Sequence, residues 1–394
     1  MVNSVRIVFI GNQDNNGYRF CKWARMLGYD TDIYMINGDY LRSMPEYVDR
    51  NLLVDGVRRY PKWIKNLENK SKMWLFFGTN VIRRIEREND IAVTFGKRGL
   101  FAANHISKIP VIHWSLGEVT DLPFQFLGKG VSFKHRIISL FARVSIMKVR
   151  KIICAYRPTI DVLKKHKLEN KLLLFGYPED VEGNRRKIDD DFLNKLNKKY
   201  SRFDKVFLWL SRVNFKNPIS PEYKGTEKFL KALKNIVLKG RKNIKAVIGE
   251  HGYDINDFKK MVVDWEMQDY IDYVPHLPYW KLLTYLSIKN AVVFDTLDSQ
   301  KGGLPGLARE SLSLGSVLVR YLDNDLISEC YGKGCPIINA YDERTCYEAM
   351  EKVLGMSDDE FEALKKRTFR WAGECLNYDK LIPKFFSLIE KEIA

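Results

Sequence analysis

The residues best suited to chemistry in this 394-residue chain cluster around a glycine-rich turn that opens a short helix. The turn runs from Gly302 through Gly306, and an acid, Glu310, follows in the second turn of the expected helix. Exposed amides at a helix start favour an anion, and a glutamate about two turns in can accept hydrogen bonds from sugar hydroxyls. The pattern therefore suits a nucleotide-sugar. The alternative is an ordinary loop–helix–strand unit in which Glu310 faces solvent.

Short apolar strands alternate with helical patterns in both halves of the chain, and these elements must position the turn. The expected strands are residues 5–10, 31–36, 91–95, 111–113, 151–155 and 172–175, then 206–210, 245–248, 271–274, 291–294 and 317–320. Such alternation is typical of parallel sheets covered by helices on both faces. We predict an α/β protein with two doubly wound domains, whose ligands bind beyond the carboxyl ends of the strands.

A polar, charged stretch separates the two series of strands. Residues 176–204 include Gly176, Pro178 and Gly183, and we place a linker at 179–204. The expected domains are then residues 1–178 and 205–376, which fits the length of the chain.

Composition limits where the protein acts. Hydrophobic residues make up 45% of the chain, but no apolar run approaches the eighteen or so residues that a membrane span needs. The first ten residues suit a strand better than a secretion signal. The six cysteines form no CxxC pair, as expected for reduced thiols in the cytoplasm.

The net charge of +16 is unevenly distributed. Residues 1–178 carry 30 Lys/Arg against 15 Asp/Glu, a net of +15, whereas residues 179–394 carry 35 against 34, a net of +1. The excess indicates an anionic partner for the first half: a membrane surface, a nucleic acid or a phosphorylated substrate.

The chain resembles the group 1 family of nucleotide-sugar glycosyltransferases, which have the GT-B fold. The likeness covers most of the chain and is strongest in residues 206–340. It is carried by Ser211-Arg212, Tyr223-Lys224-Gly225, the segments 246–252 and 269–276, and the glycine-rich loop with Glu310 and Gly315.

The resemblance implies two Rossmann-like domains facing a central cleft, with a last helix at about 377–394 that crosses back to the N-terminal domain. The implied acceptor side is residues 1–178, and the implied donor domain is residues 205–376. The implied activity is transfer of a hexose, with retained configuration, from a UDP- or GDP-linked sugar to a glycan or lipid-linked acceptor.

The resemblance assigns the donor diphosphate to Arg212 and Lys224. Arginine offers a planar fork for phosphate oxygens and lysine a mobile point charge, and fixed cations stabilise the charge that grows on the leaving phosphate. The alternative is a pair of solvated surface cations. Glu310 is assigned to the ribose. Further donor contacts fall on Gly11, Gly249, Asp295, Gly302, Gly303, Leu304 and Gly306.

One position departs from the family pattern. The family has two glutamates eight residues apart, and the first of them, which touches the transferred hexose, corresponds to Gly302 here. Asp295 or Asp298 could substitute for it. Alternatively, the glycine marks a catalytically degenerate GT-B protein that acts as a binding or scaffold module.

The resemblance also assigns an acceptor side to the N-terminal half. Asn12, Asn15 and Asn16 are expected to orient acceptor hydroxyls, and His113, followed by Glu118, is expected beside the reacting carbon as a hydrogen-bond partner or base. The alternative for His113 is a satisfied histidine at a strand end. The implied chemistry is front-face attack, with the leaving phosphate helping to take the acceptor proton, and not the two-carboxylate glycosidase mechanism.

We expect neither a metal nor a cofactor beyond the nucleotide-sugar substrate. The sequence contains no HExxH motif and no clustered His/Cys pattern, and the three consecutive acids Asp189–Asp191 are expected to be solvated in the linker.

A basic segment points to a membrane. Eight Lys/Arg and no acid occur in residues 122–160, and residues 133–150 mix basic and apolar positions at helical spacing, with a second such cluster at 60–77. We predict peripheral attachment to the cytosolic face of an anionic membrane. The alternative is that the apolar positions Ile137, Leu140, Phe141 and Val144 are the core face of a domain helix. Nucleic acid is not predicted, because no DNA- or RNA-binding signature accompanies the charge.

Overall fold

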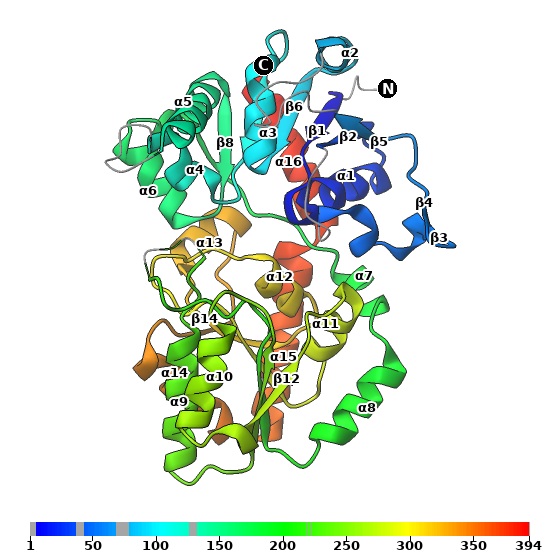
Figure 1. Ribbon diagram of the computed structural model, residues 1–394. Helices are drawn as coiled ribbons and strands as arrows, with labels where there is room; N and C mark the ends of the chain where they lie inside the picture. Colours follow the sequence, from blue (N-terminus) through cyan, green and yellow to red (C-terminus); the bar gives the residue numbers. More distant parts are fainter. Residues whose placement is uncertain are drawn as a thin grey trace. The chain divides into compact units, whose positions relative to one another are not determined.

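The computed structural model describes residues 5–36, 43–67, 79–125, 132–218, 220 and 222–393. The chain divides into two compact units (Figure 1). Unit 1 comprises Met1–Phe175 and Leu381–Ala394, and unit 2 comprises Gly176–Lys380. Each unit contains its own parallel sheet with helices around it, so the predicted α/β class is confirmed.

Unit 1 is built on a seven-stranded parallel sheet in the order β5-β2-β1-β6-β7-β8-β9. Its strands are β1 (Ile7–Ile10), β2 (Thr31–Ile36), β5 (Ile64–Leu67), β6 (Ile91–Phe95), β7 (Val111–Trp114), β8 (Lys151–Cys154) and β9 (Leu172–Leu174). All four residues of β1 are buried, because helices cover both faces of the sheet. The sequence analysis missed β5 and the small hairpin of β3 (Leu53–Val54) and β4 (Val57–Arg58).

The helices of unit 1 include the end of the chain. They are α1 (Asn16–Met26), α2 (Thr79–Glu88), α3 (Gly96–Ala102), α4 (Glu118–Asp121), α5 (Phe133–Lys148), α6 (Arg157–Lys165) and α16 (Tyr378–Ile393). Helix α16 joins this unit from Leu381 onward. Its Phe385 ring lies 4.7 Å from the Phe20 ring and 5.6 Å from the Trp114 ring, so α16 contributes to the aromatic core of unit 1.

Unit 2 is built on a six-stranded parallel sheet in the order β12-β11-β10-β13-β14-β15. Its strands are β10 (Lys205–Trp209), β11 (Ile244–Gly249), β12 (Ile271–Val274), β13 (Ala291–Phe294), β14 (Val317–Arg320) and β15 (Ile338–Asn339). From β10 the chain runs outward to β11 and β12, then returns to the other side of β10 as β13. Ligands of open α/β sheets bind at such a switch point, beyond the strand ends.

The helices of unit 2 cover both faces of this sheet. They are α7 (Val181–Arg186), α8 (Asp190–Tyr200), α9 (Thr226–Leu238), α10 (Ile255–Asp264), α11 (Tyr279–Leu286), α12 (Gly306–Ser313), α13 (Asn324–Tyr331), α14 (Glu343–Gly355) and α15 (Asp358–Trp371). A core of large side chains fixes the strand ends, among them Phe207, Trp209, Phe229 and Phe294. The described chain also contains 3₁₀ turns at residues 13–15, 45–47, 50–52, 103–105, 122–124, 169–171 and 268–270 and a π turn at 372–376.

The predicted linker at 179–204 is wrong. This stretch forms α7 and α8 and belongs to unit 2. Asp189 caps α8 by accepting a hydrogen bond from the Phe192 amide at 3.0 Å, and the next two acids lie in the first turn, where negative charge complements the helix dipole. The buried Tyr200 donates a hydrogen bond to Asp272 at 3.0 Å. A polar composition here therefore reflects a capped surface helix and not a connector.

Within the described residues, no helix has the length and apolar character needed to cross a membrane. All six cysteines are buried as free thiols.

Candidate active site

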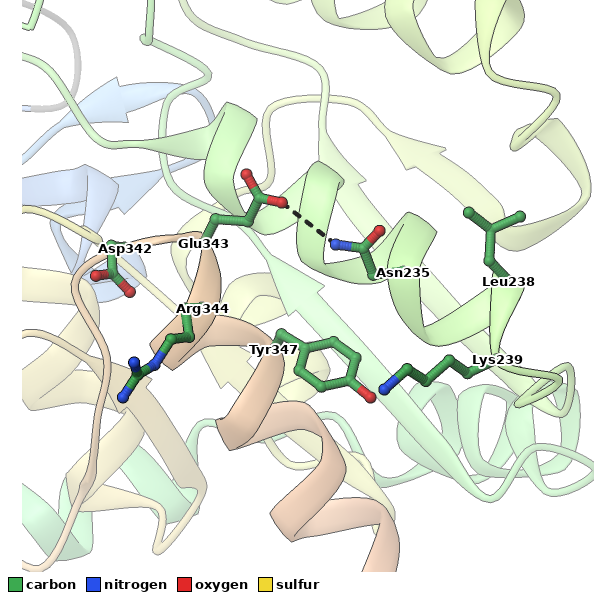
Figure 2. Close-up of a pocket in the computed structure, with 7 residues that line it drawn as sticks. All are labelled: Asn235, Leu238, Lys239, Asp342, Glu343, Arg344 and Tyr347. Carbon is green, nitrogen blue, oxygen red and sulfur yellow. Dashed lines mark hydrogen bonds between the residues drawn. The ribbon is translucent and has the colours of Figure 1, made fainter.

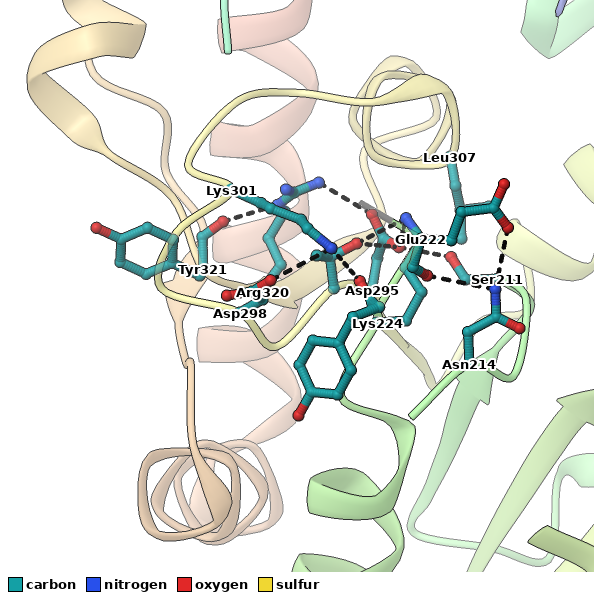
Figure 3. A network of polar contacts seen from close by, with 12 residues as sticks. Ser211, Asn214, Glu222, Lys224, Asp295, Asp298, Lys301, Leu307, Arg320 and Tyr321 are labelled. Atoms are coloured by element: carbon teal, nitrogen blue, oxygen red, sulfur yellow. Dashed lines mark hydrogen bonds and ion pairs between the residues drawn. The ribbon is translucent and has the colours of Figure 1, made fainter. Parts of the chain in front are cut away.

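The carboxyl edge of the unit 2 sheet gathers charged and polar side chains from neighbouring strands (Figure 3). Ser211 lies just after β10, Asp295 directly follows β13, and Arg320 is the last residue of β14. Lys224 comes from the segment that leads into α9. Because β10, β13 and β14 are adjacent and parallel, their ends meet at the switch point of the sheet.

Asp295 is the centre of this group. Its carboxylate is fully buried and accepts hydrogen bonds from Ser211 Oγ at 2.5 Å and from Thr296 Oγ1 at 3.0 Å. Arg320 Nη1 lies 2.9 Å from Oδ2, and Lys224 Nζ lies 3.7 Å from Oδ1. Lys224 also donates to Thr296 Oγ1 at 2.9 Å. One carboxylate thus holds two cations beside each other.

The charges shift each other's ionisation. Burial raises the pKa of Asp295, but the charges of Lys224 and Arg320, with hydrogen bonds from Ser211 and Thr296, outweigh burial and lower its pKa to about 2. Burial lowers the pKa of Lys224, Arg320 lowers it further, and Asp295 opposes both. Two cations share one carboxylate, so this cluster suits an additional anion.

The backbone of Lys224 is fixed from both sides. Its amide donates to Asn214 O at 2.8 Å, and its carbonyl accepts from the Leu297 amide at 2.8 Å. Gly225 follows at φ 75°, and a Cβ there would lie 2.7 Å from Leu297 O. Only glycine allows this close approach without strain, so Gly225 sets where Lys224 enters the cluster.

Arg212 lies at the rim of the group. Its guanidinium pairs with Glu222 at 2.9 Å, and roughly a third of each side chain is exposed. Asn214 Nδ2 also approaches Glu222 Oε2, at 3.4 Å. Arg212 is therefore close to the strand end, as predicted, but an incoming phosphate would compete with Glu222 for it.

The glycine-rich loop carries a further buried cation. Lys301 pairs with Asp298 at 3.3 Å and donates a hydrogen bond to Tyr223 O. Burial lowers the pKa of Lys301, and Lys224 lowers it further, against the opposing charge of Asp298. The loop thus adds a neutral ion pair that ties it to the segment before α9 through Tyr223 O.

Helix α12 begins at Gly306, as the sequence predicted. Glu310 is only 8% exposed, so the alternative of a solvated acid is wrong. The carbonyl of the buried Leu304 accepts from Arg309 Nη1 at 2.9 Å, and the Gly303 amide bonds to Lys301 O at 2.5 Å. Gly249 ends β11, at the same edge of the sheet.

The first loop of unit 1 has a different character. Gly11 takes φ 89° against Phe95 O. The buried Asn12 accepts from the Tyr18 amide at 2.7 Å and donates to Ser43 O at 2.5 Å. The other two asparagines do likewise, with Asn15 donating to Met44 O and Asn16 to Gln13 O, both at 3.0 Å. The amides predicted to orient acceptor hydroxyls instead bond within the loop, through Asn16, and to the segment after β2, through Asn12 and Asn15.

His113 is also enclosed. Its side chain is fully buried in β7, with Nδ1 2.9 Å from Thr94 Oγ1 and Nε2 2.5 Å from Glu118 Oε1. Glu118 in turn accepts from the Leu116 amide at 3.1 Å. Both ring nitrogens are paired, which fits the satisfied strand-end histidine better than contact with a sugar.

A search of the described residues for His, Cys, Asp and Glu finds no group of three or more arranged to hold a metal ion. An open groove of about 760 Å³ lies between α9 and α14 (Figure 2). It is lined by Asn235, Leu238, Lys239, Asp342, Glu343, Arg344 and Tyr347. None of these residues belongs to the charged cluster, so the groove is separate from the candidate site.

Comparisons with known proteins show which chains and folds this protein is similar to. No protein-family model matches the chain. Among curated proteins, the chain is similar to the alpha-monoglucosyldiacylglycerol synthase of Streptococcus pneumoniae, with 25% identity over 303 residues. The match covers 74% of this chain and 64% of that relative, less than two thirds of its length.

Solved structures show the fold. Anabaena HepE in complex with UDP-glucose matches with a TM-score of 0.67 and 10% identity, over 98% of this chain and 100% of that one. The sucrose-phosphate synthase of Thermosynechococcus elongatus matches with a TM-score of 0.63 and 10% identity, over 98% of each chain. The fold is GT-B. The chain is similar to glycosyltransferases of this fold.

The glycine at position 302 is built into the loop. A Cβ on Gly302 would lie 2.4 Å from Asp323 Cβ and 2.9 Å from Asp323 N, and Asp323 N donates to Gly302 O at 3.0 Å. An acid does not fit there without moving the loop. The proposed substitutes are occupied, because Asp295 is paired with Arg320 and Asp298 with Lys301.

The sequence analysis missed part of the charged cluster. It gave Arg320 no role beyond a buried strand, named Ser211 only as the neighbour of Arg212, and did not single out Thr296 or Lys301. The available signals were a cation at the carboxyl end of an apolar strand and a lysine directly before the glycine pair. Which of these side chains converge depends on the strand order, which a single sequence does not contain.

Proposed function

We propose that this protein is a retaining hexosyltransferase that transfers glucose from UDP-glucose to a lipid-linked or glycan acceptor on the cytosolic face of a membrane. The observation that carries the proposal is the convergence of Lys224 and Arg320 on one buried carboxylate at the switch point of the unit 2 sheet. The cluster has a positive excess, and a diphosphate has the charge and the two-pronged oxygen geometry to complement it.

The relatives support the donor and the acceptor class. HepE was solved with UDP-glucose, and the curated relative is named as a synthase of a monoglucosyl diacylglycerol. On that basis we choose a uridine nucleotide over a guanosine nucleotide, glucose as the sugar and a lipid-linked acceptor over a free glycan. Glu310 is the proposed ribose ligand, because its carboxylate lies on α12 directly after the glycine-rich loop.

The proposed reaction needs no carboxylate nucleophile. The bond between the sugar C1 and the phosphate oxygen breaks, a bond from the acceptor oxygen to C1 forms on the same face, and the acceptor proton passes to the leaving phosphate. Lys224 and Arg212 stabilise the charge that grows on that phosphate. The three acids at this edge support the scheme, because Asp295, Asp298 and Glu222 are each paired with a cation.

A second candidate function rests on Gly302. The loop is packed so that no acid fits at this position, and the hexose loses the contact that the family resemblance implies. A binding or scaffold module would bind UDP and UDP-glucose without transferring glucose. Release of UDP from UDP-glucose, with and without a diacylglycerol-containing acceptor, separates the two functions.

Calorimetry tests the donor site directly. UDP, GDP and ADP are titrated into the wild type, Lys224→Ala and a control, Lys231→Ala, whose side chain on α9 is 47% exposed. We expect UDP to bind most tightly of the three nucleotides. In the UDP-release assay, Lys224→Ala should reduce turnover by about 10²–10³-fold, a loss of roughly 3–4 kcal/mol in transition-state stabilisation. Lys231→Ala should behave as the wild type. Equal binding and turnover in Lys224→Ala would refute the diphosphate site.

A further inference from the structure

Helix α5 of unit 1 exposes a continuous apolar stripe. Phe133 is 79% exposed, Ile137 36%, Leu140 52%, Val144 51% and Met147 53%. The intervals of four, three, four and three residues place all five on one side of the helix. A helix of sixteen residues extends the stripe over about 24 Å. Exposed large apolar side chains are common singly, but a row of five marks an interaction surface.

The opposite side of α5 is the one that packs on the domain. Ser139, Ala142, Ser145 and Ile146 are buried, and the partly buried Phe141 meets the Phe101 ring of α3 at 5.8 Å. The alternative that Ile137, Leu140 and Val144 form a core face is therefore wrong, and only Phe141 of that set packs on the domain. Because the core face is satisfied elsewhere, the stripe needs a partner outside the domain.

The charges beside the stripe indicate which partner. At 3.6 residues per turn, Arg136 and Arg143 fall along one flank of the stripe and Lys134 and Lys148 along the other. The helix contains no acidic residue. A second copy of the chain would bring these like charges together, whereas an anionic bilayer offers hydrocarbon to the stripe and phosphates to both flanks.

We propose that α5 is the membrane-docking element of this protein, lying parallel to an anionic bilayer with the stripe from Phe133 to Met147 at the boundary between headgroups and acyl chains. Interfacial helices of this kind bury their apolar face by about 5–10 Å, and each flanking cation near the surface adds to the attraction. Of the second basic and apolar cluster predicted from the sequence, residues 60–77, positions 68–77 lie outside the described residues.

The inference deepens the proposed function, on which its biological meaning rests, by naming the surface that reaches a lipid-linked acceptor. The two ideas fail separately, because vesicle binding is measured without nucleotide and UDP binding is measured without lipid. If the protein floats with vesicles but does not bind UDP, the docking role of α5 stands and the proposed transferase function is refuted. The opposite result would remove only the docking helix.

Vesicle flotation of the full chain is the first experiment. The vesicles contain phosphatidylcholine with either 30% phosphatidylglycerol or none, at low and at physiological salt. The test variant is Leu140→Ser/Val144→Ser. Its matched control is Leu238→Ser/Val263→Ser, which removes the same two side chain types from positions 72% and 56% exposed on α9 and α10.

We expect the wild type and the control to float with the anionic vesicles and the test variant to lose about tenfold or more in partitioning. Far-UV circular dichroism and UDP binding should be the same in all three proteins. Equal flotation of test and control variants would overturn the proposal, as would failure of the wild type to bind anionic vesicles. Sedimentation at matched concentrations tests whether a second copy of the chain covers the stripe instead. A dimer that forms in the wild type and not in the test variant would assign the stripe to a dimer interface.

A fluorescent probe shows whether the stripe itself enters the bilayer. All six native cysteines are buried, so Val144→Cys provides one exposed thiol for an environment-sensitive dye, and Val263→Cys provides the control. We expect a blue shift with anionic vesicles at position 144 and none at 263. Equal shifts, or a shift only at 263, would contradict docking through α5.

Discussion

The carboxyl edges of the two sheets use their polar side chains in different ways. In unit 1, Asn12 and Asn15 are buried, and their side-chain amides donate to the carbonyls of Ser43 and Met44 in the segment after β2. In unit 2, Lys224 and Arg320 are paired with a single carboxylate, Asp295. The first edge is satisfied without a ligand, whereas the second retains a positive excess that an anion would neutralise.

The same contrast separates net charge from binding. Residues 1–178 carry nearly all of the excess positive charge, a net of +15. The cations of α5 are spread along a surface helix and do not converge on one point. Residues 179–394 are almost neutral, at +1, but their fold concentrates buried cations at one strand edge. The overall charge of a domain therefore indicates a class of partner, and the local arrangement decides where a small anion binds.

The largest effect should come from the centre of the unit 2 cluster. Asp295→Ala leaves the buried Arg320 and the partly buried Lys224 without their shared carboxylate, and we expect a loss of about 3–5 kcal/mol in the free energy of unfolding. Chemical denaturation monitored by circular dichroism measures it. Glu329→Ala, an exposed acid of α13, is the control and should change stability by less than about 0.5 kcal/mol. A loss for Asp295→Ala as small as that of the control would show that the cluster is not a structural unit.

The pH dependence of this effect has a defined sign. The pKa of Asp295 is about 2 in the folded protein, below its ordinary value of 3.8, so its contribution is present above about pH 4 and is lost as the pH falls toward 2. The stability difference between the wild type and Asp295→Asn should therefore be constant from pH 7 to about pH 4 and narrow below it. A difference that grows on acidification would contradict the depressed pKa.

A smaller effect is expected at the ribose. Glu310→Ala should weaken UDP binding by roughly 1.5–3 kcal/mol, because it removes a charged acceptor for hydroxyl hydrogen bonds. Calorimetry with UDP measures the loss. With deoxy-UDP, which lacks a ribose hydroxyl, the difference in affinity between the variant and the wild type should be smaller. If Glu310→Ala binds UDP as tightly as the wild type does, the nucleotide does not contact Glu310. The edge of the unit 2 sheet would then bind a different anion.

The smallest effect on binding belongs to unit 1. Asn12→Ala removes the acceptor of the buried Tyr18 amide, and we expect it to cost about 1–3 kcal/mol of stability. UDP affinity should stay within about twofold of the wild type, a change of under about 0.5 kcal/mol. The exposed Asn51→Ala is the control for stability. Weakened UDP binding by Asn12→Ala, with unchanged stability, would reverse the comparison and make this loop a donor contact.

The strands and the glycine-rich turn were predictable because their signals are local. The expected strands 31–36, 91–95, 271–274, 291–294 and 317–320 agree with the structure residue for residue. Each is a short apolar run bounded by turn residues, and neighbouring sequence alone specifies it. The prediction of a linker at 179–204 was wrong because it also used only local composition. A capped and charged surface helix has the same composition as a connecting segment.

The sequence by itself determined the α/β class, the alternation of elements and the placing of Glu310 on a helix after a glycine turn. Only the tertiary structure decided that Arg320 and Asp295 meet, that Asn12 of unit 1 bonds to the segment after β2, and that α5 turns Leu140 and Val144 outward. These outcomes depend on strand order and on which helix face finds the core. Both are set by contacts between residues distant in sequence, which local periodicity does not encode.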